Sequence, residues 1–81
     1  MNWQVALAEV LRGMSLGANL AGLQRYAGYL DSVANLIDAN ADVEAHMKLI
    51  VEKLKAGPIM DSDFKDAHIR IQADLDRLNA D

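Results

Sequence analysis

The sequence predicts an all-α protein, and three observations lead to this prediction. The 81-residue chain is 52% hydrophobic but only 5% aromatic, and alanine and leucine dominate its apolar residues. Residues typical of β-strands do not alternate with polar residues. Apolar residues instead recur at intervals of three and four, which is the period of one face of an α-helix. We therefore expect a long N-terminal helix followed by two shorter helices, as a three-helix bundle or as an extended helical hairpin that oligomerises.

The long helix is predicted over about residues 3–37. Asn2 is a favourable N-cap residue for its first turn. An apolar seam with spacings of four and three occupies its second half. The seam residues are Leu16, Leu20, Leu23, Ala27, Leu30, Ala34 and Ile37. A kink or break in the segment from Gly13 to Gly17 is the alternative to a continuous helix.

The second helix is predicted over about residues 42–56. Asn40 or Asp42 is expected to cap its N-terminus. Gly57 suits the position after its last turn, and Pro58 prevents the helix from continuing. Its apolar seam consists of Val43, Met47, Ile50 and Leu54.

The third helix is predicted over about residues 62–79, with Asp61 or Ser62 as its cap. Its apolar seam consists of Phe64, His68, Ile71, Leu75 and Leu78. No linker, internal repeat or low-complexity segment separates the three helices. Residues 1–81 are therefore expected to form a single helical domain.

The charge pattern argues against several classes of function. The net charge is −4; residues 1–37 sum to zero, residues 38–57 to −1 and residues 58–81 to −3. Nothing forms a basic stripe, so nucleic acid is not an expected partner. Glu9 and Arg12 interrupt the first apolar segment, so neither a signal peptide nor a transmembrane helix is expected. The expected location is the cytoplasm or a macromolecular assembly such as a virion.

No group of residues suits catalysis, a cofactor or a metal ion. The chain has no cysteine, and His46 and His68 are too few for a zinc site with three or four protein ligands. The segment Asp38–Asp42 imitates the start of a calcium loop, but Val43 and Leu49 stand where that loop requires glycine and glutamate. We therefore expect a protein that is not an enzyme.

The main indication of function is a run without charge from Gly13 to Gln24, in which small residues recur at helical spacing. Glycine costs a solvated helix about 1 kcal/mol relative to alanine, so its repeated use predicts close packing against another helix. The predicted function is assembly, through self-association or contact with a helix of a partner protein. The expected interface residues are Trp3, Leu7, Val10, Gly13, Met14, Leu16, Gly17, Leu20, Ala21, Leu23, Arg25, Tyr26 and Tyr29.

Three segments in the C-terminal third, Leu54–Gly57, Asp61–Phe64 and Ile69–Leu75, resemble the ends of many small helical proteins encoded in tailed-phage and prophage genomes. This resemblance includes no catalytic or binding motif. The resemblance to phage-encoded proteins suggests a first alternative function, in which the protein inhibits a host protein. It would bind that protein through the acidic face of its third helix or through a patch of Arg25, Tyr26 and Tyr29.

A second alternative is a protein that lies on a membrane surface through residues 3–23. Trp3 would then act as an anchor at the interface between lipid and water. This segment lacks the Lys/Arg face typical of such helices, so the membrane surface ranks below the other partners.

Overall fold

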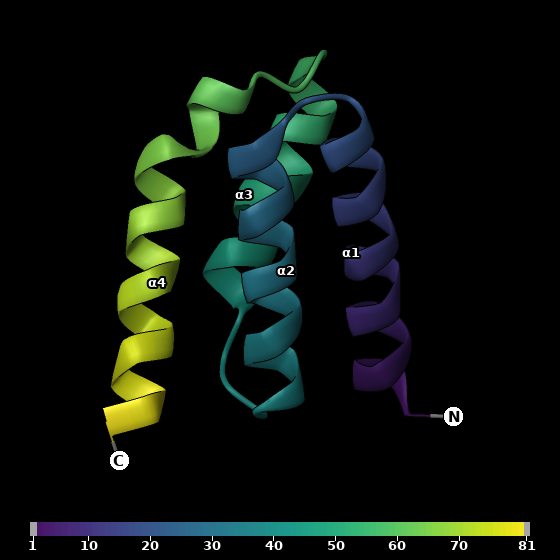
Figure 1. Cartoon of the computed structure of the whole chain (residues 1–81). Helices are drawn as coiled ribbons and strands as arrows, with labels where there is room; N and C mark the ends of the chain where they lie inside the picture. Colours follow the sequence, from purple (N-terminus) through teal and green to yellow (C-terminus); the bar gives the residue numbers. More distant parts are fainter. Residues whose placement is uncertain (1, 81) are drawn as a thin grey trace.

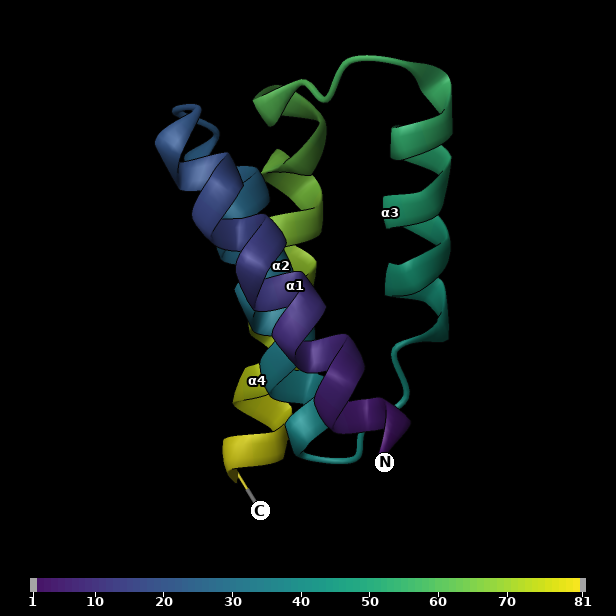
Figure 2. The same cartoon turned by 90° about the vertical axis from the view of Figure 1, so that its right-hand side faces the viewer.

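The computed structural model describes residues 2–80, which contain four α-helices and one 3₁₀ helix. In chain order these are α1 (Trp3–Leu20), α2 (Gln24–Asp38), α3 (Glu44–Ala56), η1 (Asp61–Phe64) and α4 (Lys65–Ala80). No strand occurs in the described residues, which confirms the all-α prediction. Helices α1, α2 and α4 lie side by side with α2 in the middle (Figure 1), and α3 packs on one side of this layer (Figure 2).

The predicted continuous helix over residues 3–37 is wrong, because the chain reverses between α1 and α2. Gly22 has φ +81, a left-handed conformation that side chains rarely adopt. The N–H of Gly22 donates to the carbonyl of Asn19 at 3.0 Å, and that of Leu23 donates to the carbonyl of Ala18 at 2.8 Å. These two bonds form a Schellman motif, which ends α1 with Gly22 at the position after the cap.

The break therefore lies at Gly22 and not between Gly13 and Gly17, both of which are inside α1. The N-terminal helix has 18 residues, compared with 13 to 16 in the other α-helices. The bundle contains four helices where three were predicted. The physical reason is that a reversal at Gly22 lets α1 pack against α2, which the first half of a continuous helix could not do with its own second half.

A second Schellman motif ends α2. Asn40 has φ 62, its N–H donates to the carbonyl of Ile37 at 2.9 Å, and the N–H of Ala41 donates to the carbonyl of Leu36 at 2.9 Å. Asparagine tolerates this conformation better than most residues. Asn40 thus ends α2 and does not cap the next helix.

The ends of α3 agree more closely with the prediction. The helix begins at Glu44, and the side chain of Asp42 accepts a hydrogen bond from the N–H of Glu44 at 3.0 Å. Val43 occupies the N-cap position that was predicted for Asp42, but the side chain of Asp42, one residue earlier, still satisfies a donor of the first turn. Gly57, with φ 125, stands directly after the last helical residue, Ala56.

Asp61 does not cap the last helix, which begins at Lys65 after the turn η1. Its side chain accepts a hydrogen bond from the N–H of Tyr26 at 3.0 Å, and Arg25 lies 3.8 Å from the other carboxylate oxygen. Tyr26 is in the first turn of α2, where N–H groups have no partner within the helix. A residue 35 positions later in the chain thus caps α2 across the molecule.

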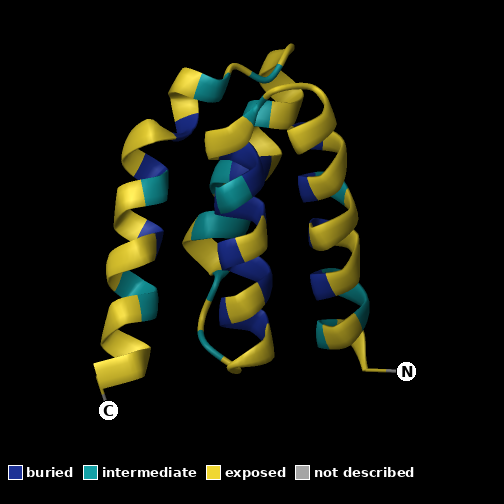
Figure 3. Ribbon diagram, in the orientation of Figure 1, coloured by how far each residue is buried: buried dark blue, intermediate teal, exposed yellow. Residues whose placement is uncertain are grey.

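The core surrounds α2, which contributes nine of the buried residues. The neighbouring helices also contribute buried residues, and those of α1 and α4 lie on the sides of their ribbons that face α2 (Figure 3). They are Ala8, Leu11, Ser15 and Ala18 of α1, Ile50 of α3, Phe64 of η1, and Ala67 and Ile71 of α4. Ser15 also donates a hydrogen bond to the carbonyl of Ala27 at 2.8 Å. Within the described residues, no helix combines the length and the apolar character needed to cross a membrane.

We predict that Gly22→Ala lowers the free energy of unfolding by about 1–2 kcal/mol, because an L-residue with a side chain is strained in the left-handed conformation. The measurement is urea unfolding followed by circular dichroism, in dilute protein. The matched control is Gly17→Ala, where the new Cβ meets nothing within 4 Å. Because Gly17 is inside a regular helix, the control should gain about 0.5–1 kcal/mol. Equal effects of the two variants would contradict the assignment of the turn.

We also predict that Asp61→Ala lowers the free energy of unfolding by about 1 kcal/mol, because the N–H of Tyr26 loses its acceptor. Asp61→Asn retains a side-chain oxygen and should cost less. The same unfolding measurement compares the two variants. The control is Glu52→Ala, which removes an exposed carboxylate from the interior of α3. If Asp61→Ala were as well tolerated as Glu52→Ala, the cap would contribute nothing.

Candidate functional site

The side of α1 that points away from α2 carries exposed apolar residues. We call the residues Val5, Ala6, Glu9, Val10, Gly13, Leu16, Gly17 and Leu20 the outward face. Val10 is 57% exposed, Leu16 63% and Leu20 83%. In Figure 3 this side of α1 is almost entirely exposed, whereas its buried residues face α2. Large apolar side chains gathered on one face of a helix are typical of a surface that binds another protein.

The two glycines of the outward face are not required by the packing of the protein itself. A Cβ atom built on Gly13 or Gly17 meets nothing within 4 Å. Gly28 of α2 is different, because a Cβ there would lie 3.0 Å from Cε1 of His68 in α4. The close approach of α2 and α4 thus explains Gly28, while Gly13 and Gly17 have no neighbour that explains them.

A hollow of about 480 Å³ lies near the N-terminal end of the outward face. It is lined by Val5, Ala6, Glu9 and Val10. Its walls are apolar apart from the carboxylate of Glu9, which is the one charge on the outward face. The hollow is therefore suited to an apolar side chain and not to a polar metabolite.

Ten of the predicted interface residues lie in α1 or in the turn that follows it, and they divide into two groups. Those exposed on α1 or at its ends are Trp3, Val10, Gly13, Leu16, Gly17, Leu20 and Ala21. Those half-buried against the core are Leu7, Met14 and Leu23. Val5, Ala6 and Glu9 were missed by the sequence analysis, although they precede Leu16 and Gly13 at helical spacings that could have identified them.

The predicted surface patch of Arg25, Tyr26 and Tyr29 does not form. Arg25 is exposed, but Tyr26 is 5% exposed and Tyr29 is fully buried. Both tyrosine rings pack against Phe64, with ring centroids 4.5 Å and 5.4 Å apart. The reversal at Gly22 turns this part of α2 toward the core, so these tyrosines cannot contact a partner.

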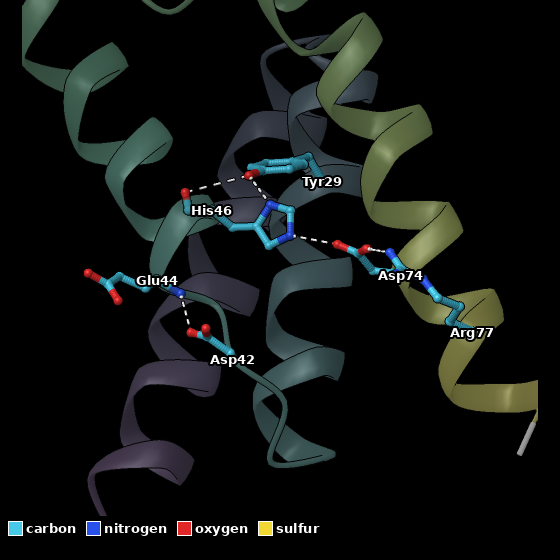
Figure 4. A network of polar contacts seen from close by, with 6 residues as sticks. All are labelled: Tyr29, Asp42, Glu44, His46, Asp74 and Arg77. Atoms are coloured by element: carbon cyan, nitrogen blue, oxygen red, sulfur yellow. Dashed lines mark hydrogen bonds and ion pairs between the residues drawn. The ribbon is translucent and has the colours of Figure 1, made fainter.

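A polar network joins α2, α3 and α4 beside the core (Figure 4). The hydroxyl of Tyr29 lies 2.8 Å from Nδ1 of His46, and Nε2 of His46 lies 3.0 Å from the carboxylate of Asp74. Arg77 donates to the other oxygen of Asp74. With a neutral His46, Tyr29 donates to Nδ1 while Nε2–H donates to Asp74, so every member has a partner.

This network connects three helices. Burial and the charge of Asp74 raise the pKa of Tyr29 to about 12, and Arg70 partly offsets this effect. The phenol therefore keeps its proton at neutral pH and is shielded from solvent. A nucleophile would need a lowered pKa and access to a substrate. His46 thus holds α3 against α2 and α4.

The two histidines have separate environments, since His46 contacts Tyr29 and Asp74 whereas His68 packs against Gly28. Neither Asp42 nor Glu44 contributes to the His46 network (Figure 4). Among residues 2–80, no three side chains of the types that bind metals come close enough to hold an ion.

We predict that Tyr29 makes the stability of the protein depend on pH in the alkaline range. Its pKa is 10.0 when unfolded and about 12 when folded. Because the folded value is higher, its contribution is complete below pH 10 and is lost as the pH rises toward 12. The loss amounts to up to about 2–3 kcal/mol.

The measurement is urea unfolding at several pH values from about 9 to 11.5. Tyr29→Phe lacks the ionising group and should lose less stability over this range than the unchanged protein. Both proteins retain Tyr26, whose pKa burial also raises, so the difference between them reports Tyr29. If the free energy of unfolding fell equally with pH in both proteins, the pKa of Tyr29 would not be raised by folding and the prediction would be wrong.

Comparison with known proteins adds no assignment of function. The chain matches no family model, no curated protein and no solved structure.

Proposed function

We propose that this protein is a non-enzymatic assembly protein that associates with copies of itself through the outward face of α1. The observation that carries the proposal is the exposure of Val10, Leu16 and Leu20 on one side of a helix whose other side is fully packed. The protein's own fold leaves this face without a neighbour. A second helix laid along it would remove these side chains from water.

The energetics are compatible with a stable oligomer. Burying one leucine or valine contributes roughly 1.5–3 kcal/mol, and the loss of translational and rotational freedom on association costs about 4–15 kcal/mol. Val10, Leu16 and Leu20 of two copies together provide six such side chains. Gly13 and Gly17 would let the helix axes approach closely, which increases the area that each copy buries.

The charge distribution favours a second copy as the occupant. Glu9 and Arg12 are the charged residues of α1, and they cancel. The net charge of −4 arises from residues 38–81. Two copies repel each other when their acidic parts meet. The outward face, with one carboxylate, is where a copy of equal charge can dock with least repulsion.

We expect sedimentation velocity over about a hundredfold concentration range to show a species heavier than the 8.9 kDa protomer. Leu16→Glu should shift the distribution toward the protomer, because its carboxylate would be buried without a partner. Val51→Glu, a matched control, removes an exposed apolar residue of α3 instead and should leave the distribution unchanged.

Gly17→Leu tests the close approach separately. A Cβ atom at position 17 meets nothing within 4 Å and the position is exposed, so the helical circular dichroism should persist while association weakens. A well-folded protomer of the unchanged protein at every concentration would contradict the proposal, as would normal assembly of both Leu16→Glu and Gly17→Leu.

A further inference from the structure

We infer that the second copy docks in the antiparallel direction, with Gly13 of both copies at a two-fold axis and Leu20 of each copy in the hollow of the other. This inference rests on the proposed self-association and specifies the relative direction and register of the two α1 helices.

Ala6, Gly13 and Leu20 are seven residues apart and so lie along one line of the helix. Gly13 is the midpoint of this line, and its ends are roughly 21 Å apart at 1.5 Å per residue. When two such helices pair in antiparallel fashion about Gly13, Ala6 of one copy faces Leu20 of the other. The same contact then forms twice, once at each end of the interface.

The sizes of the facing residues agree with this register. Leu20 has the largest exposed fraction of the large apolar residues in the described chain, at 83%. The residue that it would face, Ala6, lines the hollow of about 480 Å³. The same register places Val10 beside Gly17 and Leu16 beside Glu9, because the two-fold axis keeps residues of one side of the seam on that side. At the contacts of Leu20 with Ala6 and of Val10 with Gly17, a larger side chain faces a smaller one, as close packing requires.

A parallel pairing fits less well. It would place Leu20 against Leu20 at one end and Ala6 against Ala6 at the other, so that one end is crowded and the other leaves a void. It would also bring the two Glu9 carboxylates together within an apolar interface, where like charges repel strongly. The antiparallel register separates these carboxylates and opposes the two helix dipoles.

A two-fold axis through Gly13 uses the same face on both copies, so the assembly closes as a dimer and does not continue as a fibre. Gly13 lies where the two helices are nearest, and a glycine there permits the shortest distance between their axes. This position accounts for a glycine that nothing in the protomer explains.

The test is a charge-swap experiment with two variants, Ala6→Lys and Leu20→Glu. Each alone places two unpaired charges in the dimer, so each should raise the dissociation constant about tenfold or more. Mixed in equal amounts, they form a heterodimer in which Lys and Glu meet at one contact and the unchanged Leu20 and Ala6 meet at the other. Sedimentation velocity should therefore show restored dimer in the mixture.

The matched control mixes Ala6→Lys with Leu16→Glu, which faces Glu9 and not Ala6 in the antiparallel register and should not restore the dimer. Circular dichroism verifies that every variant remains helical. If the unchanged protein dimerises but the first mixture is no better than the control, the antiparallel register is wrong and self-association stands. If the unchanged protein is a protomer throughout, the proposed function itself fails.

Discussion

The burial of α2 is the constraint on which the rest of the structure depends. This helix is covered on three sides by α1, by α3 and by α4 with η1, and its remaining side is polar, with Asp31, Asn35 and Asp38 exposed. A chain of this length has few residues with which to form a core. One central helix that packs against all the others allows these few residues to form a single core. Each surrounding helix consequently needs only a single packed face.

Polar contacts fix how the surrounding helices meet α2. Ser15 of α1 bonds to a carbonyl of α2, Asp61 caps the first turn of α2, and His46 of α3 reaches both Tyr29 and Asp74. Buried polar groups are costly when they lose their partners. A shift of one helix along another would break at least one of these contacts, so they specify an arrangement that apolar contacts alone would leave loosely defined.

The same architecture explains why α1 has a face that no other helix of the described chain covers. It stands at the edge of the layer, and only the side toward α2 is packed. A helix at such an edge normally presents charged residues to water, yet the outward face of α1 presents valine, leucine and glycine. We interpret this departure as a sign that another protein chain covers the outward face, as in the proposed self-association.

The sequence by itself determined the helical class, the end of α3 at Gly57 and the unusual apolar character of residues 13–24. These features depend on the conformation and composition of single segments, so each can be predicted without knowing how the segments pack together. Gly22 also carried a local signal for a helix end, but Gly13 and Gly17 were equally plausible sites for a break.

Only the tertiary structure decided where the chain reverses, because the reversal is useful where it lets α1 cover α2. It also decided that Tyr26 and Tyr29 are buried and that Asp61 caps a distant helix. Whether an apolar residue faces the core or solvent depends on which neighbours fill the space around it. That information is distributed over the whole chain. Of the one seam predicted from the sequence, Leu16 and Leu20 of α1 are exposed, whereas the residues that α2 contributes are buried.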